Sequence, residues 1–312
     1  MTLNIAHRGG SALQPENTLA AFRDAVGRGC DGAELDAQLS RDGEVIVFHD
    51  YRLSPDYTRD EEGYYLRRPT PRLKDLSLSE LQSYDIGRAD PASIYALGHA
   101  NVQFRDGERI PALRDVISLA QAAPKPFHLF IELKTSFAQR DLSADPVELA
   151  EKIVALLKEK NYLDNAVLVG FDWPGLLHAK KIAPQIRCWF TTYAQSWFKP
   201  GMPPPEDEPP AEPVLQVLRQ LAEKGTSPWA GGYDAVKYGG SILKAIKAAG
   251  GDGWFPYWRD ATAATIREAH SLGLKVGAWT VNDPAAIRTL VDNKIDAICS
   301  DRPDLVGEVL GA

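Results

Sequence analysis

Two acidic residues with the spacing of a shared strand face are the first sign of chemistry in this chain. Glu34 and Asp36 lie two apart within the apolar run Ala33–Ala37, and side chains two apart on a strand point to the same face. Carboxylates held so close repel each other unless they share a proton or a cation, and hard divalent cations such as Mg²⁺ and Ca²⁺ take oxygen ligands of this kind. Taken alone, the pair is equally consistent with two solvated acids on a strand edge.

A second charged pair closes the next long apolar run. Glu132 and Lys134 follow the run that starts at Phe127, and they again share one strand face. Charged residues in an apolar strand are rarely left unpaired, so we expect Glu132 to complete a three-carboxylate cation site and Lys134 to face an anionic substrate. The alternative is a Glu–Lys pair that only stabilises the fold. The position of Glu132 at the C-terminal end of a strand favours the functional interpretation.

Two histidines stand at the ends of other apolar runs. His7 closes Leu3–Ala6 and precedes Arg8, and His49 precedes Asp50, a candidate to orient it. Two imidazoles beside one phosphate provide a general base and a general acid near neutral pH, and arginine binds phosphate in a two-pronged manner. Structural roles are assigned to the remaining histidines: His99, His128, His178 and His270.

The residues before the first expected helix carry an ambiguous signal. Asn17 or Thr18 is a plausible N-cap in the stretch Pro15-Glu16-Asn17-Thr18, because both side chains accept hydrogen bonds from the first turn of a helix. Glu16 is a candidate acid that orients His7 from behind. Its alternative role is to interact with the helix dipole.

Short apolar runs alternate with helical patterns along the whole chain. The expected strands are Leu3–Ala6, Ala33–Ala37, Leu129–Leu133, Ala166–Phe171, Cys188–Tyr193, Gly253–Tyr257, Lys275–Thr280 and Asp296–Cys299. The expected helices are Thr18–Arg28, Leu113–Ala122, Pro146–Lys160, Gly175–Ile182, Leu215–Lys224, Ser241–Ala249, Thr262–Leu272 and Pro284–Asn293. This alternation predicts a parallel sheet. Eight units without a break in composition favour one domain, 1–312, folded as a closed (β/α)₈ TIM barrel; an open doubly wound sheet is the alternative.

One hairpin and two long segments interrupt the alternation. Asp42-Gly43 predicts a hairpin that folds Val45–Phe48 back along the second strand and brings His49 toward its end. Tyr51–Arg109 is a long insertion after the second strand, and Gln195–Gly240 follows the fifth strand and contains the Pro-rich loop Pro200–Pro213. Loops that follow barrel strands lie on the C-terminal face, so both segments are candidate lids or substrate walls, or else solvated decorations.

Composition narrows the class of protein. The chain has 312 residues, 44% of them hydrophobic, and a formal net charge of −7, and we find no run of Lys and Arg that would track a nucleic acid. The three cysteines are far apart and odd in number, which indicates neither a disulfide framework nor a zinc site. No apolar run is long enough for a membrane span. We expect a cytoplasmic protein, or a periplasmic or secreted one if a signal peptide has been removed.

Nine short motifs, in this order, resemble the glycerophosphodiester phosphodiesterase family. They are His7-Arg8-Gly9, Pro15-Glu16-Asn17-Thr18, Glu34-Leu35-Asp36, Asp42-Gly43, His49-Asp50, Ile110-Pro111-Ala112-Leu113, Ile131-Glu132-Leu133-Lys134, Trp279-Thr280-Val281-Asn282 and Ser300-Asp301-Arg302-Pro303. The match is dense over Ile5–Asp50, good over Ile110–Lys134 and Lys275–Pro303, and thin elsewhere.

The resemblance implies a barrel enzyme with one divalent cation, Ca²⁺ or Mg²⁺. Its metal carboxylates fall on Glu34, Asp36 and Glu132, its catalytic histidines on His7 and His49, and its substrate-binding residues on Arg8, Lys134 and Trp279. The implied reaction hydrolyses a glycerophosphodiester to glycerol 3-phosphate and an alcohol through a cyclic phosphate. Which histidine is the base is left open, as are the preferred alcohol and the oligomeric state.

Three other interpretations are kept. A lysophospholipase D-type enzyme or another phosphodiesterase would use the same chemistry, a barrel that binds metal and phosphate would not turn them over, and a purely structural role would leave the charged pairs to stabilise the fold. Aromatic residues near the active face could wall a pocket for a lipid-like alcohol or a choline headgroup. They are Phe171, Trp197, Trp229, Trp254, Tyr257, Trp258 and Trp279.

Overall fold

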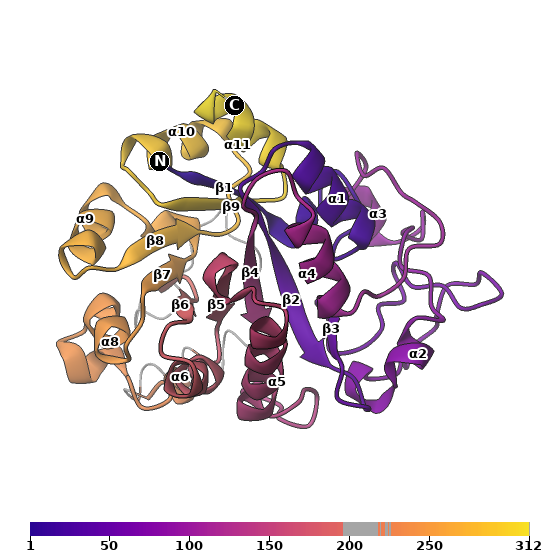
Figure 1. Cartoon of the computed structure of the whole chain (residues 1–312), viewed down its shortest axis with the longest axis horizontal. Coiled ribbons are helices and arrows are strands. Elements are labelled where there is room, and N and C mark those ends of the chain that lie inside the picture. Colours follow the sequence, from indigo (N-terminus) through magenta and orange to yellow (C-terminus); the bar gives the residue numbers. More distant parts are fainter. Residues whose placement is uncertain (196–217, 219, 222–223, 225, 312) are drawn as a thin grey trace.

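The computed structural model is a closed barrel of parallel strands surrounded by helices (Figure 1). It describes residues 1–195, 218, 220–221, 224 and 226–311. The barrel strands are β1 (Leu3–Ala6), β2 (Gly32–Leu39), β4 (His128–Leu133), β5 (Ala166–Gly170), β6 (Arg187–Thr192), β7 (Gly253–Pro256), β8 (Lys275–Ala278) and β9 (Ala297–Ser300). Strand β1 pairs with both β9 and β2, which closes the barrel. The predicted (β/α)₈ barrel is confirmed, and the open sheet is wrong.

Helices cover the outside of this barrel. They are α1 (Leu19–Gly27), α4 (Leu113–Gln121), α5 (Pro146–Glu159), α6 (Trp173–Ile182), α8 (Ile242–Ala248), α9 (Ala263–Ser271), α10 (Pro284–Asp292) and α11 (Pro303–Leu310). Thr18, Asp145 and Asp283 accept the first-turn N–H groups of α1, α5 and α10, which is the chemistry that starts a helix. Strands and helices begin and end within two residues of the predicted bounds; α11 was not predicted, and most of Leu215–Lys224 lies outside the described residues.

Short 3₁₀ helices punctuate the loops. They are η1 (His7–Gly9), η2 (Leu73–Asp75), η3 (Leu163–Asn165), η5 (Pro228–Ala230), η6 (Ala235–Tyr238) and η7 (Trp258–Asp260). The first of them begins where β1 ends and carries two of the residues expected to do chemistry.

Alternation along each strand divides the side chains between two cores. In β2, Ala33, Leu35 and Ala37 face outward into the large core beneath the helices. Residues that face inward form a smaller core inside the barrel, among them Ile5, Phe130, Val169, Trp189 and Phe255. Because the period is two, the inward positions nearest the C-terminal end of each strand open onto one shared mouth.

The predicted hairpin is confirmed. Strand β3 (Val45–Val47) pairs antiparallel with the end of β2, with Ala37 opposite Val47 and Leu39 opposite Val45. The Phe48 N–H donates to the Asp36 carbonyl at 2.9 Å, which extends the pairing to the residue before His49. The chain therefore returns His49 to the level of the acids on β2.

The insertion, residues 51–109, folds around a core of its own beside β3 (Figure 1). Leu53, Leu73, Leu81 and Ile86 are buried there against Ile46. The insertion contains the short helices α2 (Leu78–Leu81) and α3 (Ile94–Gly98). The insertion is therefore packed around buried side chains, and its role as a lid or substrate wall stays a prediction. The predicted Pro-rich loop, Pro200–Pro213, lies outside the described residues.

Two expectations from composition can be compared with the structure. Cys30, Cys188 and Cys299 are all buried and unpaired. Among the described residues, no helix has the length and apolar character that crossing a membrane requires.

Candidate active site

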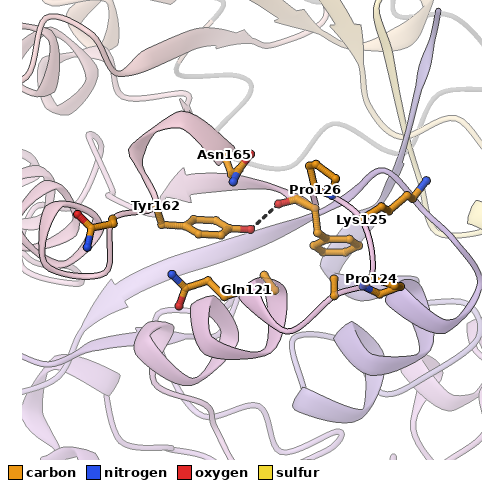
Figure 2. Close-up of a pocket in the computed structure, with 10 residues that line it drawn as sticks. Gln121, Pro124, Lys125, Pro126, Tyr162 and Asn165 are labelled. Atoms are coloured by element: carbon orange, nitrogen blue, oxygen red, sulfur yellow. Dashed lines mark hydrogen bonds between the residues drawn. The ribbon is translucent and has the colours of Figure 1, made fainter.

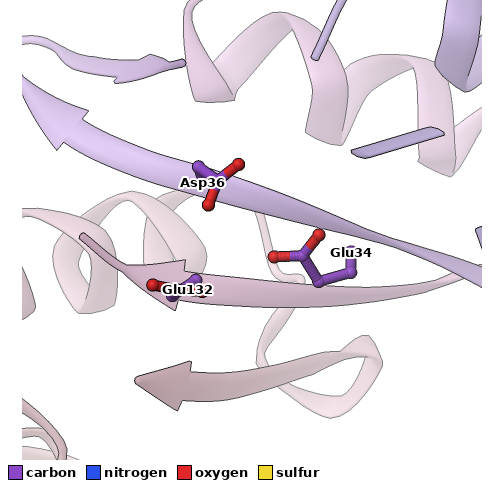
Figure 3. A group of neighbouring side chains, drawn as sticks. All are labelled: Glu34, Asp36 and Glu132. Atoms are coloured by element: carbon purple, nitrogen blue, oxygen red, sulfur yellow. The ribbon is translucent and has the colours of Figure 1, made fainter. Parts of the chain in front are cut away.

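The three predicted carboxylates meet at the mouth of the barrel. Asp36 and Glu132 lie opposite each other in the pairing of β2 with β4, and one oxygen from each of Glu34, Asp36 and Glu132 lies within 4.8 Å of the others (Figure 3). Glu34 is 2% exposed and Asp36 1%. Burial and the Asp36 charge raise the pKa of Glu34 to about 8. A cluster with this excess of negative charge and hard oxygen donors suits a divalent cation.

Lys134 bridges two of these acids. Its Nζ lies 3.0 Å from a Glu132 oxygen and 3.1 Å from an Asp36 oxygen. Although burial acts in the opposite direction, the Lys134 and Arg8 charges hold the pKa of Asp36 well below its usual range. The ion pair considered from sequence is thus present, and it lies within the carboxylate cluster rather than apart from it.

His7 is oriented by Asp301, which follows β9. The His7 Nδ1 and an Asp301 oxygen are 2.5 Å apart, and the His7 Nε2 lies 3.8 Å from Glu34. Burial disfavours the charged imidazole, but the Asp301 carboxylate outweighs it and raises the pKa of His7. Ser11 and Asn282 donate hydrogen bonds to Asp301 at 2.5 and 2.7 Å. Asp301 is a site residue that the sequence argument missed.

His49 has a partner of its own. Its Nδ1 lies 2.8 Å from an Asp50 oxygen, as the sequence suggested for Asp50. The Gln38 amide donates to the carbonyls of Phe48, His49 and Asp50 at 2.7, 3.3 and 2.9 Å, which fixes the backbone that carries the imidazole. The His49 charge also lowers the pKa of Asp36, whereas His7 is beside Glu34. The two imidazoles therefore lie near different carboxylates of β2, His7 near Glu34 and His49 near Asp36.

Arg8 reaches the acids with both its backbone and its side chain. Its φ of 49° is left-handed, a conformation that is uncommon for residues other than glycine and that clusters at functional sites. In this conformation the Arg8 N–H donates to Glu34 at 3.1 Å. The next residue, Gly9, has φ 84°, and a Cβ there would lie 2.6 Å from the Ala21 side chain. The close approach of α1 thus requires glycine after Arg8.

Glu16 holds Arg8, and the prediction that it orients His7 is wrong. The Arg8 guanidinium donates to Glu16 at 2.9 Å, and the Tyr95 hydroxyl of the insertion donates to the other Glu16 oxygen at 2.9 Å. The imidazole is already satisfied by Asp301, which reaches it from the far end of the chain. The contact between His7 and Asp301 was not predicted because the two residues are far apart in the sequence.

The two candidate N-cap residues have separate tasks. Thr18 caps α1 by accepting from the Ala21 N–H at 3.1 Å. The Asn17 amide instead donates to Asp36 at 2.8 Å, so it holds one of the three clustered carboxylates.

Trp279 lies at the same mouth, on the side away from β2. Its indole N–H donates to the Phe255 carbonyl at 3.1 Å, and its ring is 5.3 Å from Phe171. Other aromatic residues proposed from sequence are placed differently. Trp254 is buried in the outer core, Trp258 packs against that core, and Trp197 lies outside the described residues. The ring of Tyr193, which was not proposed, lies 4.3 Å from that of Phe171 and is tilted by 33°.

The pocket shown in Figure 2 is elsewhere. It has a volume of about 330 Å³ and is lined by the end of α4 and the segments that precede β4 and β5, including Lys125 and Asn165. Tyr162 donates a hydrogen bond to the Phe127 carbonyl beside it. These segments lie at the N-terminal ends of the strands, the face that in such barrels serves stability rather than catalysis.

Comparison with known proteins now defines the class. Residues 7–305 match the model of the glycerophosphoryl diester phosphodiesterase family. The chain belongs to this family, and the predicted enzyme class, a phosphodiesterase of this family, is confirmed.

Two relatives in sequence illustrate the similarity. A glycerophosphodiester phosphodiesterase from Caldanaerobacter subterraneus subsp. tengcongensis is 34% identical over 189 residues, which span 60% of this chain and 65% of that protein. A Bacillus subtilis (strain 168) protein assigned to the same enzymes is 34% identical over 302 residues, 97% of this chain and 95% of that protein.

Solved structures agree on the fold. A Silicibacter pomeroyi protein assigned to the glycerophosphoryl diester phosphodiesterases has a TM-score of 0.80 at 26% identity and covers 98% of this chain and 92% of its own. An Oleispira antarctica phosphodiesterase in complex with the product sn-glycerol-3-phosphate has a TM-score of 0.68 at 23% identity, covering 99% of this chain and 96% of its own.

Proposed function

We propose that this chain hydrolyses glycerophosphodiesters to glycerol 3-phosphate and an alcohol, with the help of a divalent cation. The observation that carries the proposal is the convergence of three clustered carboxylates with two imidazoles, each oriented by its own acid. A barrel that only bound metal and phosphate would need neither oriented imidazole. Glycerol 3-phosphate is also the product that the Oleispira antarctica phosphodiesterase holds.

Glu34, Asp36 and Glu132 would hold the cation. One oxygen of each lies within 4.8 Å of the others, and carboxylate oxygens are the donors that both Ca²⁺ and Mg²⁺ take. The cation would supply charge stabilisation to the phosphoryl oxygens.

The chain's own residues would carry the proton transfers and the remaining charge. One of His7 and His49 takes the proton of the glycerol 2-hydroxyl as its oxygen attacks phosphorus, and the other protonates the departing alcohol oxygen. Water then opens the cyclic phosphate by the reverse use of the two groups. Arg8 and Lys134 face the phosphoryl oxygens as preorganised positive charges, which is the kind of interaction that usually contributes most.

The test is release of glycerol 3-phosphate from glycerophosphocholine, with EDTA and then with Ca²⁺ or Mg²⁺ restored. We expect turnover that EDTA abolishes and a cation restores. Turnover that persists in EDTA would contradict the cation's role. Absence of turnover with glycerophosphocholine, other glycerophosphodiesters and lysophospholipids would contradict the proposal. It would favour the alternative of a barrel that binds metal and phosphate without turning them over.

A further inference from the structure

Two tyrosines of the insertion contact acids that stand behind the candidate catalytic residues. The Tyr95 hydroxyl donates to Glu16, and the Tyr57 hydroxyl donates to Asp50 at 3.4 Å. The centroids of the two rings are 4.8 Å apart. Asp50 is the carboxylate beside His49. The insertion therefore reaches one of the two imidazoles through a single carboxylate.

Asp50 divides its two oxygens between an imidazole and a phenol. Its Oδ1 lies 2.8 Å from the His49 Nδ1, and its Oδ2 accepts from Tyr57. With the part of the chain that the structure describes, this carboxylate makes no other hydrogen bond. Gln38 holds the Asp50 carbonyl but not the side chain, and Asp50 is partly exposed. The Tyr57 hydroxyl is thus the group that keeps the carboxylate from turning toward water.

The carboxylate beside the other histidine is held in a similar way. The Asp301 Oδ1 lies 2.5 Å from the His7 Nδ1, and the Asp301 Oδ2 accepts from the Asn282 amide at 2.7 Å. In both pairs one oxygen faces the imidazole, and a neutral side chain donates to the other oxygen. The Tyr57 contact is longer than the Asn282 contact, so we expect it to contribute less.

Packing in the insertion fixes the position of the Tyr57 hydroxyl. Tyr57 is 7% exposed and lies in the buried core of the insertion. Its ring centroid is 5.7 Å from that of Phe48, the residue before His49. Burial and the charges of Glu16 and Asp50 raise the pKa of the Tyr57 phenol. The phenol therefore keeps its proton and is the donor in the contact with Asp50.

We propose that Tyr57 is a positioning residue, which acts on the proton-transfer group His49 through Asp50. This inference rests on the proposed function. With Oδ2 held by the phenol, Oδ1 stays on the Nδ1 side of the imidazole. A hydrogen bond from Nδ1–H fixes the ring and its tautomer and leaves Nε2 for proton transfer. The insertion thus contributes to catalysis at a point where it does not touch the substrate.

The first test compares Tyr57→Phe with the wild type in release of glycerol 3-phosphate from glycerophosphocholine. The variant keeps the buried ring and loses only the hydroxyl, so we expect kcat to fall by about 3- to 10-fold with KM nearly unchanged. Tyr65→Phe is the matched control, because that hydroxyl donates to the Ala89 carbonyl elsewhere in the insertion. An unchanged kcat in Tyr57→Phe, or an equal loss in the control, would overturn the inference.

A double-mutant cycle tests whether Tyr57 acts through Asp50. In an Asp50→Ala background, Tyr57→Phe should cause no further loss of kcat, since the carboxylate that the phenol holds is gone. Losses that multiply in the double variant would overturn the inference. Circular dichroism establishes that each variant compared is folded.

A measurement without turnover separates this inference from the proposed function. The ring nitrogens of His49, labelled with nitrogen-15 and assigned with His49→Gln, report the tautomer of the neutral imidazole by NMR. We expect the proton on Nδ1 in the wild type and a mixture of tautomers in Tyr57→Phe. This change, without turnover by the wild type, would overturn the proposed function and leave the positioning by Tyr57. Turnover with the same tautomer in both chains would overturn the inference and leave the proposed function.

Discussion

The mouth of this barrel has two halves that are formed by neighbouring parallel strands but differ in side-chain chemistry. On β9, β1, β2 and β4 the inward side chains at the mouth include Asp301, His7, Asp36 and Lys134, all of them held by ion pairs. On β5 to β8 the residues that follow the strand ends include the aromatic residues Phe171, Tyr193, Tyr257 and Trp279. The strand register is common to both halves, so the difference lies in side-chain chemistry alone: one half is arranged to handle charge and protons, and the other to contact carbon.

We expect the largest loss of activity when the cation site in the charged half of the mouth is altered. Glu34→Gln keeps the shape of the side chain but removes one anionic ligand, and we expect activity to fall by about a thousandfold or more, since the charge stabilisation by a metal amounts to several kcal/mol. The assay is glycerol 3-phosphate release at saturating Ca²⁺ and at saturating Mg²⁺. Near wild-type activity in this variant would remove Glu34 from the cation site.

A histidine change should separate the two halves. His7→Ala removes a proton-transfer group and is expected to lower kcat by roughly 10²- to 10⁴-fold for every glycerophosphodiester. Phe171→Leu is expected to change mainly the ranking of substrates. A His7→Ala enzyme that lost activity toward only one substrate would contradict the assignment of proton transfer to the charged half of the mouth.

The Asp301 contact predicts a pH effect with a defined sign. Asp301 raises the pKa of His7, so Asp301→Asn should move the limb of the pH–rate profile that reports His7 toward lower pH, whether His7 acts as acid or base. Asn282→Ala removes a hydrogen-bond donor to Asp301 but leaves the Asp301 carboxylate in place. It should therefore shift the same limb of the pH–rate profile by less than Asp301→Asn does. A profile in Asp301→Asn that matched the wild type would contradict the role of Asp301.

The cluster also predicts how stability depends on pH without a cation. The pKa of Glu34 is raised to about 8 in the folded chain, above an unfolded value of about 4.3, so the folded state binds the extra proton. Stability should therefore fall as pH rises from about 4 to 8. Glu34→Gln should flatten this fall in melting temperature measured in EDTA; an equally steep fall in the variant would assign it to other groups.

The smallest effect is expected from the insertion. Tyr95→Phe removes the hydroxyl that holds Glu16 behind Arg8, and we expect about a 2- to 10-fold loss of kcat/KM, mainly through a higher KM. Tyr65→Phe is the matched control, because that hydroxyl donates to the Ala89 carbonyl within the insertion. Equal effects of the two changes would indicate a general loosening of the insertion and no specific support of Arg8.

Local patterns predicted the frame of the molecule and the centre of its charged half. Period-two spacing placed Glu34 and Asp36 on one face, and Asp42-Gly43 predicted the hairpin that returns His49 to them; both follow from residues within one or two elements. The meeting of Glu132 with Asp36 followed once the barrel was assumed, because neighbouring parallel strands end at the same edge.

Contacts that depend on distant packing were not predictable in the same way. Asp301 reaches His7 only because β9 closes the barrel against β1, and Glu16 turns to Arg8 because Tyr95 of the insertion meets it from the other side. The motif that contains Asp301 was noticed without a role. Tyr193 was overlooked, although it ends a predicted strand just as Phe171 and Tyr257 do.

The cation site is tested by calorimetric titration of Ca²⁺ and Mg²⁺ into the wild-type chain and into Glu34→Gln. We expect one cation to bind per wild-type chain, and the variant to lose most of this binding while remaining folded by circular dichroism. Absence of cation binding in the wild type, or equal binding in the folded variant, would contradict the assignment of this site.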